Sequence, residues 1–185
     1  MALSLCTVDS ITHIAIGACA GEWMAGRKLG RKAMLWGALA HSLPDIDFIA
    51  GAWMDTSAEL LAHRGFTHSL LFSFLVVPLF SLTAGRLHTK EGIPLFRWVL
   101  FFSIEVLLHL FLDGFNNYGI GWLEPFSHER FSFNAIYVAD PFFSIWPGIA
   151  LFMLLLMNRF HDSRGFWWRF GLFLPLIYLG YCTFN

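Results

Sequence analysis

Four stretches of the chain are apolar over a length that can cross a lipid bilayer, and they constrain the fold more than any other feature. They are residues 68–85, 94–115, 140–157 and 166–184. A spanning α-helix needs about 20 apolar residues. Of the 185 residues, 57% are hydrophobic and only 14% are charged, and a soluble domain could not bury that much apolar surface. We therefore predict an all-α membrane protein with four full transmembrane helices.

Two shorter apolar segments, residues 10–26 and 33–43, precede the four spans. At a rise of about 1.5 Å per residue the second covers only about half of the hydrocarbon thickness, and Pro44 ends it. We predict that these segments form an N-terminal helical hairpin packed against the bundle. The whole chain, residues 1–185, is expected to be one membrane-embedded domain.

The basic residues lie mostly on one side of this predicted zigzag. Ten of the 12 Lys and Arg residues fall in one set of turns: Arg27, Lys28, Arg31, Lys32, Arg86, Lys90, Arg97, Arg159, Arg164 and Arg169. By the positive-inside rule these turns are cytoplasmic, and the opposite, acidic side is extracytoplasmic. We expect Glu22 to pair with Arg27 or Lys28. The net charge of −1, without a basic patch interleaved with aromatic residues, gives no sign of nucleic-acid binding.

Histidine and aspartate residues from separate segments gather on the acidic side. The candidate metal ligands are His13, His41, Asp45, Asp47, His63, His68, His109 and Asp113. His109 and Asp113 are four residues apart, so they share one helix face and can bind one ion. Imidazole and carboxylate are the ligands of zinc and similar divalent ions. We predict a metal centre at the extracytoplasmic face.

Each of these segments also has an ordinary structural explanation. Asp45 and Asp47 could be turn residues after Pro44, and His63 and His68 could be interfacial histidines. Placing so many ionisable groups together near a membrane is costly, however. Their joint presence therefore favours a functional site.

The motifs resemble the signature blocks of one known family. The blocks are DSITHIAIG at 9–17, HSLPDID at 41–47, HRGFTHS at 63–69, HLFLDGFNNYG at 109–119 and PFSHERFSFNAIYVADP at 125–141. In this order they resemble the YdjM-like, LexA-regulated, inner-membrane-associated metal-dependent hydrolases of bacteria, over nearly the whole chain. The resemblance implies a multi-pass hydrolase of the bacterial inner membrane, and a phospholipase is one activity that it suggests.

That family is distantly similar to zinc-dependent phospholipase C and P1-type nucleases. In the wider group an HxxxD pair binds zinc, and His109 and Asp113 match that pair. The wider group also uses a later His-x-x-x-Glu pair, which does not follow Asp113 in this chain. We therefore expect one or two divalent ions, with zinc as the metal, in place of three.

Together these observations predict a metal-dependent hydrolase that acts on a phosphoester, such as a phospholipid supplied by the bilayer. A metal-activated water would be the nucleophile, with Asp9 or a non-ligating member of the cluster as its general base. Arg64 and Arg130 would orient the phosphate. One rival is a divalent-metal transporter, whose ligands should lie near the membrane midplane. The other is a non-catalytic membrane protein with a structural metal and a closed coordination shell.

Overall fold

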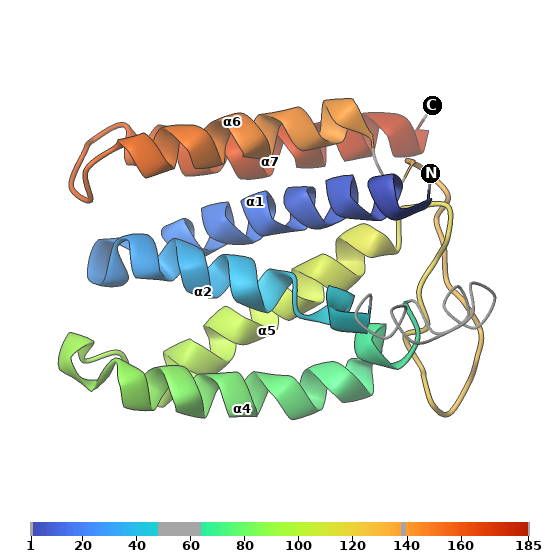
Figure 1. The fold of residues 1–185 in the computed structure, drawn as a ribbon, viewed down its shortest axis with the longest axis horizontal. Coiled ribbons are helices and arrows are strands. Elements are labelled where there is room, and N and C mark those ends of the chain that lie inside the picture. The colour runs from blue at the N-terminus through green and yellow to red at the C-terminus, as the bar shows by residue number, and fades with distance from the viewer. Residues whose placement is uncertain (1, 48–63, 138–139, 185) are drawn as a thin grey trace. The chain divides into compact units, whose positions relative to one another are not determined.

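Helices are the main elements of the parts of the chain that the structure describes (Figure 1). This computed structural model describes residues 2–47, 64–137 and 140–184, with the backbone alone over 2–9. These residues form six α-helices, short 3-10 segments and isolated β-bridge residues, among them the pair Ile120 and Phe131, and they contain no strand. The all-α prediction is confirmed for the described residues.

The chain divides into two compact units, and each is described here by itself. Unit 1 comprises Met1–His41 and Ala135–Asn185, and unit 2 comprises Ser42–Asn134. Each unit contains a helical hairpin of consecutive helices, as expected for a chain with short connections between apolar helices. That residues 1–185 act as one functional domain stays a prediction.

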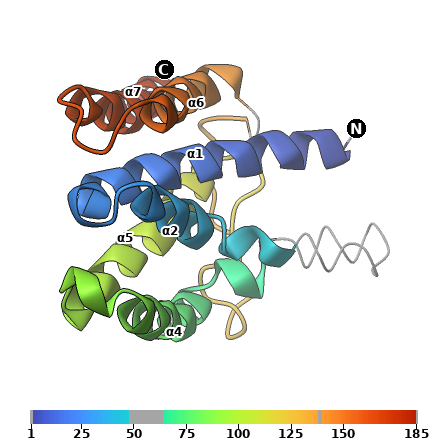
Figure 2. The same ribbon diagram turned by 60° about the vertical axis from the view of Figure 1, so that its left-hand side comes forward.

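In unit 1 the first two helices form the predicted N-terminal hairpin. They are α1 (Ala2–Leu29) and α2 (Arg31–His41), which run side by side in Figures 1 and 2. Gly30 joins them with a φ of 61°, a left-handed conformation that glycine adopts without strain. A Cβ atom at Gly21 would collide with the carbonyl oxygen of Ala33. The hairpin therefore depends on small residues that let the two backbones approach closely.

The rest of unit 1 is a second hairpin of α6 (Pro141–Leu156) and α7 (Arg164–Phe184). The Asp140 side chain caps α6 by accepting hydrogen bonds from the backbone N–H groups of Phe142, at 2.8 Å, and Phe143, at 3.2 Å. These bonds satisfy donors that have no partner within the helix. The start of α6 is thereby fixed by the sequence that precedes it.

A buried ion pair connects the two hairpins of unit 1. Arg164 donates to both carboxylate oxygens of Glu22, each at 2.7 Å, and also to the backbone oxygen of Leu154, at 2.8 Å. The expected pairing of Glu22 with Arg27 or Lys28 is wrong. Glu22 points into unit 1, where a bidentate guanidinium partner compensates its buried charge better than a solvated side chain could.

Unit 2 holds the candidate site and is arranged around a third hairpin. Its elements are η2 (Phe66–His68), α4 (Leu70–Leu87), η3 (Thr89–Glu91) and α5 (Leu95–Asp113), followed by a loop over 114–134. The Ser69 side chain caps α4 by accepting from the backbone N–H of Phe72 at 3.0 Å. The loop is held to the end of α5, because the N–H of Phe133 donates to the carbonyl of Gly114 at 2.7 Å.

Two of the described helices, α4 and α5, are long and apolar enough to cross a membrane. Only 22% of α4 is buried, which is the pattern of a lipid-facing helix, whereas a soluble core helix would be mostly buried. The helix α6 is apolar but has 16 residues, short of the usual span. The prediction of four full transmembrane helices is therefore not confirmed, although a helical membrane protein is supported.

Candidate metal centre

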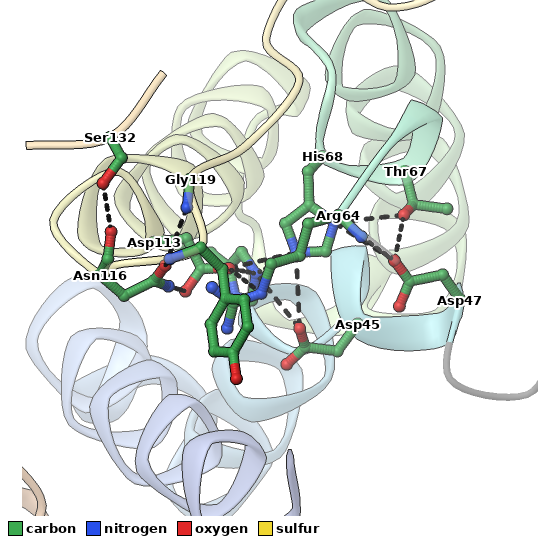
Figure 3. Close-up of polar contacts among 11 residues, drawn as sticks. Asp45, Asp47, Arg64, Thr67, His68, Asp113, Asn116, Gly119 and Ser132 are labelled. Carbon is green, nitrogen blue, oxygen red and sulfur yellow. Dashed lines mark hydrogen bonds and ion pairs between the residues drawn. The ribbon is translucent and has the colours of Figure 1, made fainter. Parts of the chain in front are cut away.

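Four donor residues converge at one end of the α4–α5 hairpin of unit 2, and Figure 3 labels three of them, Asp45, His68 and Asp113. Asp45 lies in a 3-10 turn over 44–47 that begins at Pro44, and His68 ends η2 just before α4. Asp113 is the last residue of α5, and His109 lies one turn before it. All four side chains are buried. The turn, the short helix and the helix end thus bring two imidazoles and two carboxylates together from three chain segments.

One atom of each residue points into a common space. His68 Nε2 lies 3.2 Å from Asp113 Oδ2, 3.5 Å from Asp45 Oδ1 and 3.2 Å from His109 Nε2. His109 Nε2 lies 3.6 Å from Asp45 Oδ1 and 3.5 Å from Asp113 Oδ2. All four atoms lie within 4.8 Å of one another.

These separations fit a single divalent ion. Nitrogen and oxygen ligands about 2.0–2.1 Å from a tetrahedral ion are about 3.3–3.4 Å apart, close to the 3.2–3.6 Å measured here. The donor types, two imidazoles and two carboxylates, suit zinc and other borderline divalent metals. The described residues of unit 2 can therefore hold one ion with little rearrangement.

The carboxylates around His68 favour a positive charge within this group of side chains. Burial by itself lowers the pKa of the His68 imidazole, but its contacts with Asp113, Asp45 and Asp47 outweigh that effect and raise the pKa to about 10. A proton on His68 thus balances the carboxylates when no ion is bound. A divalent ion would supply the same positive charge, and it must displace the proton to bind.

Arg64 is the cationic residue beside this cluster. Its side chain is buried, its Nε lies 3.7 Å from Asp113 Oδ2, and its guanidinium lies 5.9 Å from the centre of the Tyr118 ring. Its φ is 61°, a left-handed conformation that costs a residue other than glycine about 1–2 kcal/mol. The backbone is held there on both sides, because the Arg64 N–H donates to Asp47 and its carbonyl accepts from the N–H of Gly121 at 3.1 Å.

Asn116 holds the other oxygen of Asp113. Its amide Nδ2 donates to Asp113 Oδ1 at 3.4 Å, while its Oδ1 accepts from the backbone N–H groups of Tyr118, at 3.0 Å, and Gly119, at 3.2 Å. Asp113 Oδ2 is thus left to face the histidines. Partners of this kind orient ligands at metal sites, and here the same residue also shapes the turn after α5.

Asp47 is the remaining predicted ligand of unit 2 that the structure describes, and it lies outside this group of four. Asp47 contacts the far nitrogen of His68, with Oδ2 at 3.5 Å from Nδ1. His63 lies outside the described residues. His128, a histidine of the following loop that was not among the predicted ligands, is exposed and pairs with Glu124 at 2.9 Å.

In unit 1, His13 on α1 and His41 at the end of α2 form a buried pair with ring centroids 5.3 Å apart. Whether this pair also binds an ion stays a prediction.

The predicted catalytic residues have different surroundings. Arg64 is beside the cluster, as described above, whereas Arg130 is exposed in the 114–134 loop. The side chain of Asp9 lies outside the described residues. Sequence reasoning missed Thr67, whose hydroxyl contacts both Asp47 and His68. Its position next to a candidate ligand was the only signal that could have identified it.

Comparisons with known proteins place the chain in a family of membrane proteins. It is 37% identical to the inner membrane protein YbcI of Escherichia coli K12 over 123 residues, covering 65% of this chain and 69% of that protein. It is 29% identical to the uncharacterized protein YfhP of Bacillus subtilis 168 over 177 residues, covering 81% of this chain but about half (51%) of that protein. No solved structure matches the chain. The family model described as YdjM inner membrane protein matches residues 8–185, and the chain therefore belongs to the YdjM inner membrane protein family.

Proposed function

We propose that this protein is a membrane-bound, metal-dependent hydrolase that acts on phosphoesters such as phospholipids. The observation that carries the proposal is the convergence of four donors beside the buried guanidinium of Arg64, in which the Nε2 atoms of His68 and His109 lie 3.2–3.6 Å from each other and from the two carboxylate oxygens. A divalent ion held there would supply a Lewis acid for a phosphoryl oxygen and would lower the pKa of a water nucleophile. Zinc is the metal that this donor set favours most directly.

The residues of the chain have separate tasks in this proposal. Asp45, His68, His109 and Asp113 hold the ion, and Arg64 binds the phosphate oxygens with its planar guanidinium. The contact between Arg64 and Asp113 keeps the guanidinium next to the ion site. Asp9 remains the candidate general base, and Arg130 a candidate second phosphate contact on the 114–134 loop.

The site also suits a substrate that comes from the bilayer. His68 lies directly before α4, and Asp113 ends α5, so both lie at the ends of the two helices that can cross a membrane. A lipid headgroup lies at that level. We propose that the protein is a multi-pass protein of the bacterial inner membrane. The site would lie on the extracytoplasmic face, because the basic turns are expected on the cytoplasmic side.

One specific observation favours a structural metal site as the second candidate. Four protein donors can fill a tetrahedral shell and leave no position for a water. Against this, a structural ion has no need of a buried arginine beside one of its ligand carboxylates, because the cationic guanidinium and the ion repel each other. A transporter is less well supported, because its ligands should lie near the midplane of the spans, whereas three of these four donors lie at or outside the ends of α4 and α5.

The test begins with metal content and ends with turnover. Detergent-purified wild type and the His109→Ala, Asp113→Ala double variant are compared by elemental mass spectrometry, with Glu124→Gln as a control that removes a carboxylate outside the cluster. Hydrolysis of a chromogenic phosphodiester and of phospholipid vesicles is then measured. We expect about one ion bound to unit 2, and we expect only the double variant to lose it. Arg64→Met should reduce the turnover without loss of the metal.

Each contrary result has a defined meaning. Folded wild type without metal, after incubation with zinc, manganese and iron, would refute the metal centre. Bound metal without turnover of either substrate would support a structural site. Uptake of metal into proteoliposomes without turnover would support transport.

A further inference from the structure

The imidazole of His68 is contacted at both of its nitrogens, and the two contacts are chemically different. Nε2 faces the common space shared with His109, Asp45 and Asp113. Nδ1 lies on the opposite side of the ring, 3.2 Å from Thr67 Oγ1 and 3.5 Å from Asp47 Oδ2. Figure 3 shows Asp47 and Thr67 on the side of His68 away from Asp113. The two carboxylates of the 44–47 turn thus approach different nitrogens of the ring, Asp45 at Nε2 and Asp47 at Nδ1.

The contacts of Thr67 indicate which way the hydrogen bonds run. Its hydroxyl donates to Asp47 Oδ2 at 3.1 Å, so the hydroxyl oxygen is left to accept from His68 Nδ1–H. Asp47 accepts and cannot donate when it is ionised. A proton is therefore retained on Nδ1, and the lone pair of the neutral ring is directed from Nε2 toward the ion site. A metal ligand histidine with its second nitrogen on a carboxylate has this arrangement.

The same oxygen of Asp47 also holds the backbone of Arg64. The Arg64 N–H donates to Asp47 Oδ2 at 2.8 Å, at the residue whose φ is 61°. Left-handed backbone at a bulky residue persists only where its surroundings enforce it. Asp47 is therefore connected to both the candidate ligand His68 and the candidate phosphate-binding residue Arg64.

We propose that Asp47, assisted by Thr67, is a positioning residue that orients His68 Nε2 toward the metal and holds Arg64 in place, and that it is not itself a metal ligand. This inference rests on the metal centre of the proposed function but not on its hydrolase activity. It replaces the ligand role expected for Asp47 from the HSLPDID motif and leaves Asp45 as the ligand from that turn.

The test measures metal affinity in place of activity. The dissociation constant for Co²⁺ is determined by chelator competition for wild type, Asp47→Asn, Thr67→Val, Thr67→Ser and Asp113→Asn, each with its metal-free melting temperature. The visible absorption of bound Co²⁺ reports the number and geometry of its ligands. Glu124→Gln is the matched control.

We expect Asp47→Asn and Thr67→Val to weaken Co²⁺ binding by about 10- to 100-fold. At saturating Co²⁺ their spectra should keep the wild-type intensity, since all four donors remain. Thr67→Ser, which keeps the hydroxyl, should restore the wild-type affinity. Asp113→Asn should alter the spectrum, because it removes a ligand.

Three results would overturn the inference in distinguishable ways. An Asp47→Asn protein with wild-type affinity and a lower melting temperature would show that Asp47 only stabilises the turn. An altered spectrum matching that of Asp113→Asn would show that Asp47 is a ligand. Absence of Co²⁺ binding by the folded wild type would refute the metal centre together with this inference, whereas bound Co²⁺ without phosphodiester turnover would refute the hydrolase alone.

Discussion

Replacing Asp113 by asparagine removes the charge that lies closest to the other donors. Its Oδ2 is 3.2 Å from His68 Nε2, 3.5 Å from His109 Nε2 and 3.7 Å from Arg64 Nε. Asparagine has nearly the same size, so the packing at the end of α5 is preserved. We therefore expect a folded protein that has lost one anionic ligand.

The size of the effect follows from the number of donors. Zinc binds to small structural sites with about 10–16 kcal/mol. Shared among four donors, this is about 2.5–4 kcal/mol for each, which corresponds to a loss of about two to three orders of magnitude in affinity. Asp113→Asn should therefore bind zinc about 100- to 1,000-fold more weakly than wild type.

The assay is competition for zinc against a chromophoric chelator in detergent, with circular dichroism to establish the helical fold. Glu124→Gln serves as the control, because Glu124 belongs to the same unit but pairs with the exposed His128. A folded Asp113→Asn protein that binds zinc as tightly as the wild type would refute the assignment of Asp113 as a ligand. It would also remove the main argument for an ion between α5 and the 44–47 turn.

Three further predictions concern stability. The folded-state pKa of His68 is about 10, above its usual 6.5. Its proton therefore stabilises the metal-free protein fully below about pH 6.5, and that contribution is lost as the pH rises toward about 10. Thermal unfolding in a chelator should show this decline in stability, and His68→Gln should flatten it. Glu22→Gln leaves the buried Arg164 without its carboxylate and should destabilise unit 1 by about 3–5 kcal/mol, measured by chemical unfolding; an unchanged midpoint would contradict the importance of the pair. Ser69→Ala removes the cap of α4 and should cost about 1 kcal/mol, whereas Ser69→Asp should retain most of the stability.

The helices were largely predictable because their signals are local. Apolar stretches of sufficient length predict helices directly, and α2, α4 and α5 appear within two residues of the expected boundaries. The first helix is longer than the expected 10–26, because α1 spans Ala2–Leu29. The membrane-spanning character of each helix was less predictable, since α6 has only 16 residues and α7 begins at the buried Arg164. Glu22 shows the same limit: its partner is far away in sequence, so near neighbours suggested the wrong pairing.

The candidate site was predictable in its residue types but not in its assignment of roles. The HxxxD spacing requires that His109 and Asp113 share one face, because a helix repeats every 3.6 residues. The sequence offered Asp45 and Asp47 as equivalent, whereas the structure directs one to Nε2 of His68 and the other to Nδ1. That difference depends on how the turn meets the end of η2.

By itself, the sequence determined that the chain is helical and apolar, that it carries several His and Asp residues near helix ends, and that it resembles a membrane family. Only the tertiary structure decided which donors meet and which imidazole nitrogen faces them. It also decided that Arg64, whose backbone has a left-handed conformation, lies beside Asp113. The physical reason is that helix formation follows from neighbours within one or two turns. A cluster of four donors from three segments exists only after the packing of those segments has brought them together.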